Sequence, residues 1–164
     1  MFVRPIGDLI RQRLLEERRF IQVLAGPRQT GKTTLAHQVV DALDLPVHVA
    51  SGDAAAPRDH VWVEQQWATG RLVAARAGAL GAVLVLDEIQ KITGWSEVVK
   101  RLWDEDAVTG VNLKAMVLGS SPLLVQRGLG ESLAGRFEVI PVTHWSFAEM
   151  RSAFDWDLAK QFVL

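Results

Sequence analysis

The sequence predicts an α/β fold in which a parallel sheet of about five strands carries helices on both faces. Two observations support this prediction. Short apolar runs alternate with segments of helical periodicity along the chain, and one run, AVLVL at residues 82–86, is apolar throughout. A strand without polar alternation is typical of a parallel sheet that is covered on both faces. Strands that alternate with helices in turn predict right-handed crossovers between parallel neighbours.

The individual elements follow from residue type and spacing. Apolar or β-branched runs predict strands at residues 20–25, 45–50, 82–86, 113–118 and 137–142. Apolar residues at three- and four-residue spacing predict helices over residues 6–14, 32–43, 61–77 and 95–104. A short helix is expected from Pro122, and the segment beyond Trp145 is expected to be helical. Gly70 is a point at which the third helix could break into two pieces.

Composition limits the classes of protein that the chain can represent. Its 164 residues suit a single domain, and a formal charge of −1 gives no global attraction to nucleic acid or to a membrane. The longest apolar stretch, residues 77–86, is far below the roughly 20 residues of a membrane-spanning helix. The arginines at positions 4–19 are interrupted by acids and are expected to form a solvated helix face. The absence of cysteine fits a reducing compartment, so a cytoplasmic location is expected.

Residues 26–33 (GPRQTGKT) match the pattern G-x-x-x-x-G-K-[ST] between a predicted strand and a predicted helix, the context in which this pattern binds phosphate. Loop N–H groups and the positive end of a helix attract polyphosphate. Lys32 is expected to reach the β- and γ-phosphates, and the Thr33 hydroxyl to bind Mg²⁺. The alternative is a glycine-rich turn before an ordinary helix, which the flanking elements disfavour. The expected nucleotide-binding residues are Gly26, Pro27, Arg28, Gln29, Thr30, Gly31, Lys32, Thr33 and Thr34.

An acidic pair, Asp87 and Glu88, follows the apolar strand at residues 82–86. Asp87 is expected to hold the Mg²⁺ together with Thr33, and Glu88 to orient and deprotonate an attacking water. This division of roles favours hydrolysis over binding alone. The alternative is that a strand leaving the core simply ends in polar residues, and that Glu88 is a solvated side chain or an ion-pair partner.

Two further candidates lie after the fourth strand and before the fifth. A sheet of order 5-1-4-3-2, as in P-loop ATPases with an added central strand, would place Ser120 between the loop and Asp87, where it could sense the γ-phosphate. Ser121 is the second choice for this role, although it could instead cap the helix from Pro122. Arg136 could stabilise transition-state charge in a neighbouring subunit, or it could be a lone surface arginine.

Taken together, these motifs resemble the prokaryotic AAA-type ATPases, P-loop NTPases usually described only as ATP-binding proteins. The resemblance covers nearly the whole chain and rests on GPRQTGKTTL at 26–35, LDEIQKITGW at 86–95, VLGSSPLLV at 117–125 and ESLAGRFEVIPVTHWSFAEM at 131–150. It implies nucleotide and Mg²⁺ binding through Lys32, Thr33 and Asp87, catalysis by Glu88 and a sensor at Ser120.

The resemblance also concerns assembly. Arg136 precedes the last core strand, as does an arginine that often acts across a subunit interface in AAA-type proteins. Two departures are visible. VTHWSF at residues 142–147 replaces a proline-serine-phenylalanine turn that is usual in the family. Longer members also carry a carboxy-terminal domain of unknown function, so we expect residues 1–164 to form one ATPase domain that ends before a lid or partner domain.

The leading functional hypothesis is therefore a Mg²⁺-dependent ATPase that binds ATP and ADP, couples turnover to a conformational change and turns over slowly as an isolated domain. A homo-oligomer formed through Arg136 and an unidentified protein partner are expected, with no membrane contact and no strong nucleic-acid signal. One alternative is an ATP-gated interaction module with little or no hydrolysis. Another is a kinase that passes phosphate to a small acceptor, which the adjacent acids favour less than water activation.

Overall fold

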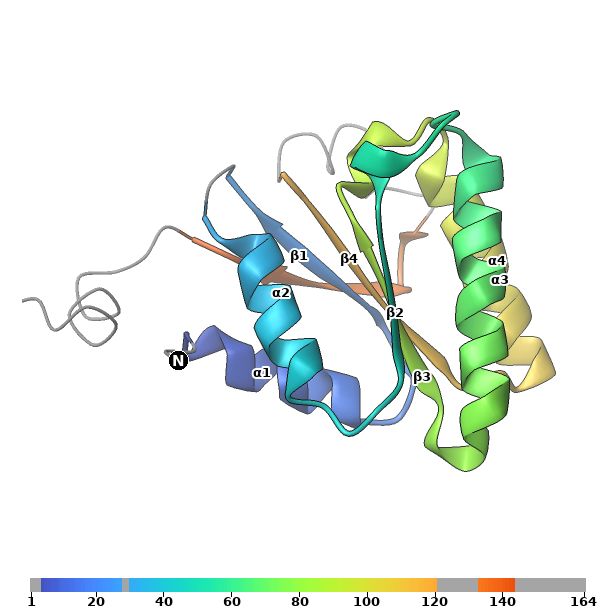
Figure 1. The fold of residues 1–164 in the computed structure, drawn as a ribbon, viewed down its shortest axis with the longest axis horizontal. Coiled ribbons are helices and arrows are strands. Elements are labelled where there is room, and N and C mark those ends of the chain that lie inside the picture. The colour runs from blue at the N-terminus through green and yellow to red at the C-terminus, as the bar shows by residue number, and fades with distance from the viewer. Residues whose placement is uncertain (1–3, 28–29, 121–132, 144–164) are drawn as a thin grey trace, which may run out of the picture.

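The computed structural model describes residues 4–27, 30–120 and 133–143, and these ranges contain one five-stranded sheet (Figure 1). The strands are β1 Ile21–Gly26, β2 Val47–Ser51, β3 Ala82–Asp87, β4 Leu113–Ser120 and β5 Phe137–Pro141. Their order is β2-β3-β4-β1-β5, and every neighbouring pair is parallel. The expected order 5-1-4-3-2 is confirmed, so the central strand β4 lies between β3 and β1, and the ends of these three strands are neighbours.

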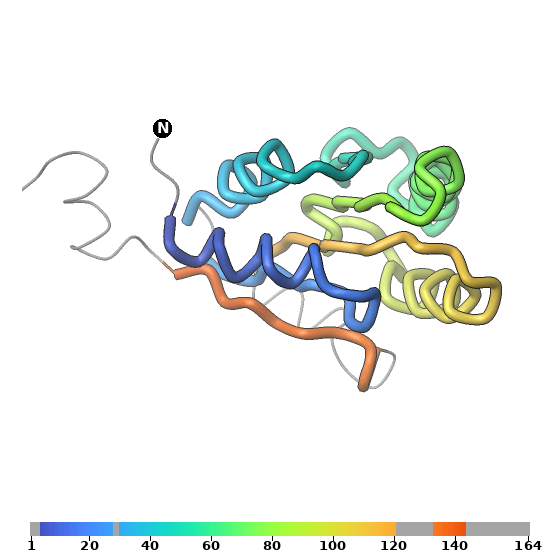
Figure 2. Tube along the Cα trace, turned by 90° about the horizontal axis from the view of Figure 1, so that it is seen from below, coloured from blue at the N-terminus to red at the C-terminus, as the bar shows by residue number. Residues whose placement is uncertain are grey.

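Helices cover both faces of the sheet, as predicted. The helices are α1 Ile6–Leu15, α2 Lys32–Asp41, α3 His60–Ala77 and α4 Trp95–Thr109, and the short 3-10 turns are η1 Gly52–Ala54, η2 Gly78–Leu80 and η3 Ile89–Lys91. Figures 1 and 2 show α1 and α2 on one face and α3 and α4 on the other. None of the helices in the described ranges is both long and apolar enough to cross a bilayer.

Strand β3 explains why the sheet needs cover on both sides. Val83 and Val85 pack into a cluster with the apolar residues of α1 and α2, whereas Leu84 and Leu86 pack with those of α3 and α4. All four side chains are at most 2% exposed. Burying each such side chain contributes about 1.5–3 kcal/mol, so two separate cores stabilise this strand.

Gly70 does not break the third helix, because α3 runs without interruption from His60 to Ala77. A Cβ atom at Gly70 would lie 3.1 Å from a side-chain carbon of Leu113 and 3.6 Å from Leu84. The glycine therefore allows α3 to approach the sheet closely. The expected helix at residues 95–104 is also longer than predicted, because α4 continues to Thr109 and ends before Gly110, whose φ is 76°.

The expectation of a solvated arginine face is wrong for Arg4 and Arg18. Arg4 is only 5% exposed, and its guanidinium donates to the backbone oxygens of Thr30 and Thr143, each at 2.9 Å. Arg18 lies 3.5 Å from the centre of the Trp103 ring and donates to two backbone oxygens. These cations hold separate segments of the fold together.

The helix predicted from Pro122 and the helical segment beyond Trp145 fall outside the described residues.

Candidate functional site

The carboxyl ends of β1, β4 and β3 meet at one edge of the sheet. Gly26 at the end of β1 pairs in register with Ser120 at the end of β4, and Asp87 at the end of β3 pairs with Ser51 of β2. A cleft of about 320 Å³ lies at this edge, and its described lining residues are Gly31, Lys32, Thr33, Thr34, Glu88, Lys91 and Ser120. Segments that are far apart in the sequence thus converge where the sequence predicts a binding site.

The loop that joins β1 to α2 is shaped by close backbone approaches. A Cβ atom at Gly26 would lie 2.0 Å from the backbone oxygen of Val142, so only glycine fits there. Gly31 has a φ of 80°, in the region that glycine enters without strain, and α2 begins at the next residue. Thr30 donates from its hydroxyl to the backbone oxygen of Pro27 at 3.0 Å. Arg28 and Gln29, also predicted for this loop, lie outside the described residues.

Lys32 is held by the loop that precedes it. Its Nζ donates to the backbone oxygens of Gly26 at 3.0 Å and Pro27 at 2.7 Å, and the residue is 9% exposed. Burial lowers the pKa of Lys32, while the carboxylates of Glu88 and Asp87 act in the opposite direction. The ammonium group therefore lies at the mouth of the loop with acidic side chains nearby. The positive end of α2 adds to the attraction for an anion there.

Thr33 and Asp87, the two predicted Mg²⁺ ligands, are in direct contact. The Thr33 hydroxyl donates to Asp87 Oδ2 at 2.7 Å, so its oxygen lone pairs remain available to a metal. Neighbouring oxygens of an octahedral Mg²⁺ site lie about 2.9 Å apart, which follows from metal–oxygen distances of 2.0–2.1 Å. The two oxygens therefore fit Mg²⁺, either as neighbouring ligands or with Asp87 orienting the threonine. Water and phosphate oxygens would supply the other positions.

Glu88 has an unusual backbone conformation that its neighbours maintain. Its φ is 52°, the only positive value for a non-glycine residue among those described. Its N–H donates to Asp87 Oδ1 at 2.8 Å, and its Oε2 accepts from the Gln90 amide at 2.6 Å. A non-glycine residue in this region costs free energy, and such strain is found most often at functional sites. The carboxylate lines the cleft beside Thr33 and Ser120.

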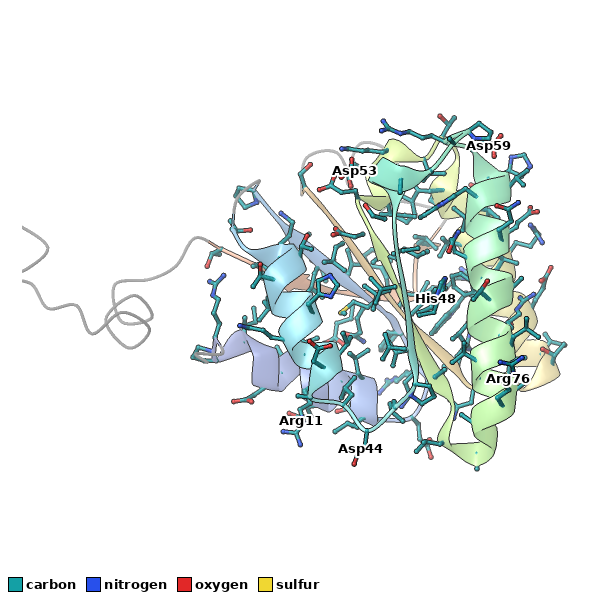
Figure 3. All side chains as sticks on the ribbon, in the orientation of Figure 1. Arg11, Asp44, His48, Asp53, Asp59 and Arg76 are labelled. Atoms are coloured by element: carbon teal, nitrogen blue, oxygen red, sulfur yellow. The ribbon has the colours of Figure 1, made fainter. Side chains whose placement is uncertain are left out.

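Lys91 is a residue of the cleft that the sequence analysis did not identify. Its Nζ lies 3.9 Å from Glu88 Oε2 and forms an ion pair with Asp53 of η1. Figure 3 shows Asp53 at the same end of the molecule as Asp59, opposite the end that carries Asp44 and Arg76. The signal available in the sequence was weak: Lys91 follows Glu88 by three residues, but its role depends on where η1 lies.

Arg136 does not join the cleft. Its backbone oxygen accepts from Ile21 N at 2.8 Å, which places it at the amino-terminal edge of the sheet, away from the end of β1. Its guanidinium donates to both carboxylate oxygens of Asp104, at 2.8 and 3.0 Å. This hydrogen bonding lowers the pKa of Asp104 and raises that of Arg136. The second sensor candidate, Ser121, lies outside the described residues.

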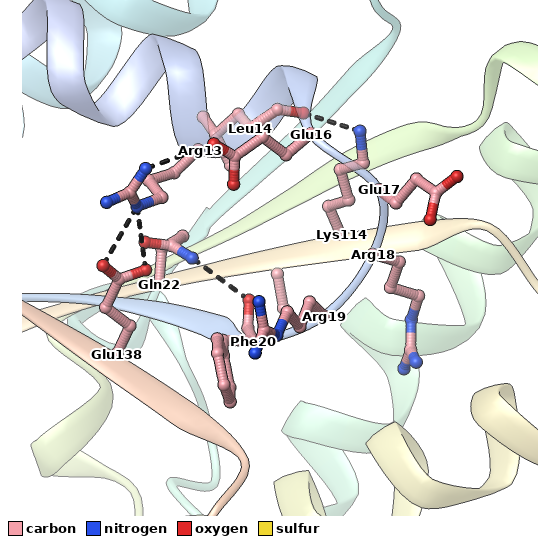
Figure 4. A pocket seen from close by; sticks show the side chains of 11 residues that line it. Arg13, Leu14, Glu16, Glu17, Arg18, Arg19, Phe20, Gln22, Lys114 and Glu138 are labelled. Atoms are coloured by element: carbon pink, nitrogen blue, oxygen red, sulfur yellow. Dashed lines mark hydrogen bonds and ion pairs between the residues drawn. The ribbon is translucent and has the colours of Figure 1, made fainter.

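A second hollow of about 280 Å³ lies at the same amino-terminal edge (Figure 4). Here Arg13 Nε donates to both oxygens of Glu138, at 3.0 and 3.1 Å, and Lys114 Nζ donates to the backbone oxygen of Leu14 at 2.7 Å. These cations already have partners within the chain. The hollow is therefore separate from the cleft at the ends of β1 and β3 in both position and chemistry.

Comparison with known proteins places this architecture in a class and then in a family. The parallel sheet, its strand order and the strand–loop–helix at Gly26 are those of the P-loop NTPase fold. Residues 18–151 match the AAA domain family, so the chain belongs to the AAA-type P-loop ATPases. Membership of this family makes the chain a nucleotide-binding, ATPase-like protein.

Individual relatives agree with this assignment at the level of the fold. A katanin structure from a study of its self-assembly aligns with a TM-score of 0.58 and 19% identity over 88% of this chain and 53% of that one. The RuvB Holliday junction branch migration motor of Thermotoga maritima aligns with a TM-score of 0.52 and 22% identity. This alignment covers 88% of this chain and 44% of that one. The Lon protease of Mycolicibacterium smegmatis is 42% identical over 78 residues, which span 44% of this chain and 10% of that protein. The chain thus covers only part of each protein.

Proposed function

We propose that residues 1–164 act as one ATPase domain that binds ATP with Mg²⁺ in the cleft and hydrolyses it to ADP and phosphate. The observation that carries this proposal is the convergence of Lys32, Thr33 and Glu88 from two distant segments on one cleft, with Asp87 hydrogen-bonded to both Thr33 and Glu88. Turnover would be coupled to a conformational change, because the described lining residues of the cleft lie at or beyond the ends of three different strands.

The residues divide the work in binding. Loop N–H groups and the start of α2 would bind the phosphates, and Lys32 would exchange its two backbone acceptors for phosphate oxygens. Thr33 and Asp87 would hold Mg²⁺, whose charge offsets that of the phosphates. Ser120 would sense the γ-phosphate, a role supported by its register pairing with Gly26 and its place in the lining of the cleft.

Glu88 would act as the general base of hydrolysis. Its backbone N–H is held by Asp87 and the residue lines the cleft, which supports a role in accepting a proton from a water that attacks the γ-phosphorus. The phosphoryl group then passes to that water, and ADP is the leaving group. General bases contribute about 10²–10⁴-fold to rates.

Two substitutions test this proposal. Glu88→Gln should lower phosphate release at least 100-fold, the scale typical of a general base, while ATP affinity stays within a few-fold of the unsubstituted protein. Lys32→Ala should weaken binding of ATP and ADP alike. Calorimetry and phosphate release measure these outcomes, with Lys100→Gln on α4 as a matched control outside the cleft. Unchanged turnover in Glu88→Gln would remove the general-base role, and unchanged affinity in Lys32→Ala would remove the phosphate-binding role.

A nucleotide-gated switch with little hydrolysis is the second candidate. The observation that favours it is the short contact, 2.6 Å, between Glu88 Oε2 and the Gln90 amide, which makes this oxygen a weaker base toward water. The two candidates differ in turnover. A switch would bind a partner with different affinities in its ATP-bound and ADP-bound states. It would not release phosphate catalytically.

A further inference from the structure

Lys91 is a second cation at the cleft, and it is held differently from Lys32. Among the described lining residues, these two lysines are the only cations. Lys32 is 9% exposed and hydrogen-bonded to the loop backbone, whereas the Lys91 side chain is 32% exposed and forms ion pairs with the carboxylates of Asp53 and Glu88. A lysine side chain has a flexible four-carbon stem. Its ammonium group can therefore move over several ångströms while the backbone stays in place.

The position of Lys91 matters because of Glu88. If a nucleotide occupies the cleft, its terminal phosphate brings negative charge close to the Glu88 carboxylate, and two like charges at such a distance repel each other. Lys91 Nζ already lies 3.9 Å from Glu88 Oε2. A small shift toward the cleft would place it between the carboxylate and the phosphate, where it attracts both.

Asp53 is the group that competes for Lys91. It belongs to η1, directly after β2, and its N–H is fixed by the Ser51 hydroxyl at 3.2 Å. Its side chain is 55% exposed, so loss of the ion pair leaves a carboxylate that water can solvate. The cost of releasing Lys91 from Asp53 is therefore small.

We infer that Lys91 binds the γ-phosphate of ATP, and that Asp53 holds Lys91 when this phosphate is absent. This inference rests on the proposed function, because it names the residue of the cleft that distinguishes ATP from ADP. The Lys91–Asp53 ion pair links η3 to η1. ATP would break this ion pair, and the pair would form again after the γ-phosphate leaves. The contact between the segments that follow β2 and β3 would therefore differ between the ATP-bound and ADP-bound states.

The test compares two affinities. Dissociation constants for Mg²⁺–ADP and for a Mg²⁺-bound, non-hydrolysable ATP analogue are measured by calorimetry on the full chain and on four variants: Lys91→Gln, Lys91→Arg, Asp53→Asn and the control Lys100→Gln. Lys91→Gln should weaken analogue binding about tenfold, the size of one charge-assisted contact, and leave ADP binding within twofold. Lys91→Arg should retain most of the preference. Asp53→Asn should strengthen analogue binding a few-fold, because the competing carboxylate is gone.

Other outcomes overturn the inference. Equal loss of both nucleotides in Lys91→Gln would indicate a structural role only, and an unchanged affinity ratio would show that Lys91 does not contact the γ-phosphate. Weaker analogue binding in Asp53→Asn would contradict the competition. These results leave the proposed function intact, provided that Lys32→Ala weakens binding of both nucleotides. If the unsubstituted chain binds neither nucleotide, the proposed function fails and the inference with it.

Discussion

Gly52 and Glu88 are in backbone contact at the point where η1 meets η3. A Cβ atom at residue 52 would lie 2.5 Å from the backbone oxygen of Glu88, a distance that real side chains do not occupy. Only glycine at position 52 therefore accommodates the Glu88 backbone, whose φ of 52° is itself strained. Because Glu88 carries the proposed base, a substitution outside the cleft can move the group on which hydrolysis depends.

Gly52→Ala should consequently impair both stability and turnover. Overpacking of this kind typically costs about 1–3 kcal/mol, because backbone atoms must shift. The fold-decrease in the rate of phosphate release should exceed the fold-decrease in affinity for ADP. The reason is that Glu88 is displaced while the Gly26 loop is not. Urea unfolding and nucleotide titration measure the two effects. Ala54→Ser, at an exposed position of the same turn, is the matched control and should change neither quantity.

The Arg136–Asp104 contact makes a prediction about pH. Arg136 lowers the pKa of Asp104 below its ordinary value of 3.8, so the contact contributes stability above that value. The contribution is lost as the pH falls through the lowered pKa and the carboxylate is protonated. In Arg136→Gln the Asp104 pKa should return toward 3.8, as measured by carboxyl NMR titration. An unchanged titration would mean that the two side chains do not interact in solution.

At the scale of elements, α3 and α4 are joined by a buried carboxylate. Asp106 of α4 is 1% exposed and accepts from Trp67 Nε1 at 2.8 Å and from Arg71 Nε at 2.7 Å, both on α3. Removing one partner of a buried ion pair leaves the others without a counterpart. This contact therefore holds the two helices of one face in register.

Asp106→Ala should lower the free energy of unfolding by about 1–3 kcal/mol, the range for leaving a buried hydrogen-bonding group without its partner. The loss comes mainly from the indole N–H of Trp67, because the Arg71 guanidinium keeps Glu105 and the backbone oxygen of Leu102 as partners. Glu64→Ala is the control, because its ion pair with Arg101, at 2.7 Å, is solvent-exposed and should contribute under about 1 kcal/mol. Equal effects in urea unfolding would contradict the buried-pair argument.

The elements also show which features a sequence can predict. All five strands and the helices around them follow from local periodicity, because burial on both faces imposes continuous apolar runs such as residues 82–86. Gly70 was misjudged, since its effect depends on the distance between α3 and Leu113 rather than on helix propensity. The length of α4 was underestimated because Asp106 is polar in sequence but buried in the fold.

The candidate site divides in the same way. Lys32 and Thr33 could be selected from the G-x-x-x-x-G-K-[ST] pattern, and Asp87, Glu88 and Ser120 because they lie just after predicted strands, whose parallel arrangement brings such ends together. Arg4, Gly52, Asp53 and Lys91 could not, because their contacts join segments whose spacing in the sequence carries no signal.

At the scale of the whole molecule, the cleft with Glu88 and the side chain of Arg136 lie at opposite ends of the strands. The cleft forms at the carboxyl ends of the strands, while Arg136 precedes the first residue of β5 and pairs with Asp104. Arg136 therefore cannot reach the cleft of its own chain without a large rearrangement. If it acts in catalysis, it acts on a second copy after leaving Asp104.

Complementation between two inactive variants tests this arrangement. Glu88→Gln keeps Arg136 but lacks the base, and Arg136→Ala keeps the base but lacks the guanidinium. A mixture of the two should release phosphate faster than either alone, because a complete site forms between different chains. The rate per chain of the unsubstituted protein should also rise with protein concentration. The control is the variant that carries both substitutions. If the mixture releases phosphate no faster than either single variant, Arg136 has no role in trans.

The two hydrogen bonds from Lys32 to its own loop carry a consequence for selectivity. The ammonium group donates to the backbone oxygens of Gly26 and Pro27, which use two of its three N–H groups. Orthophosphate would replace these two contacts with few others. A polyphosphate that follows the loop would also gain backbone N–H donors. The hydrogen bonds of Lys32 to its own loop should therefore favour polyphosphates over small inorganic anions.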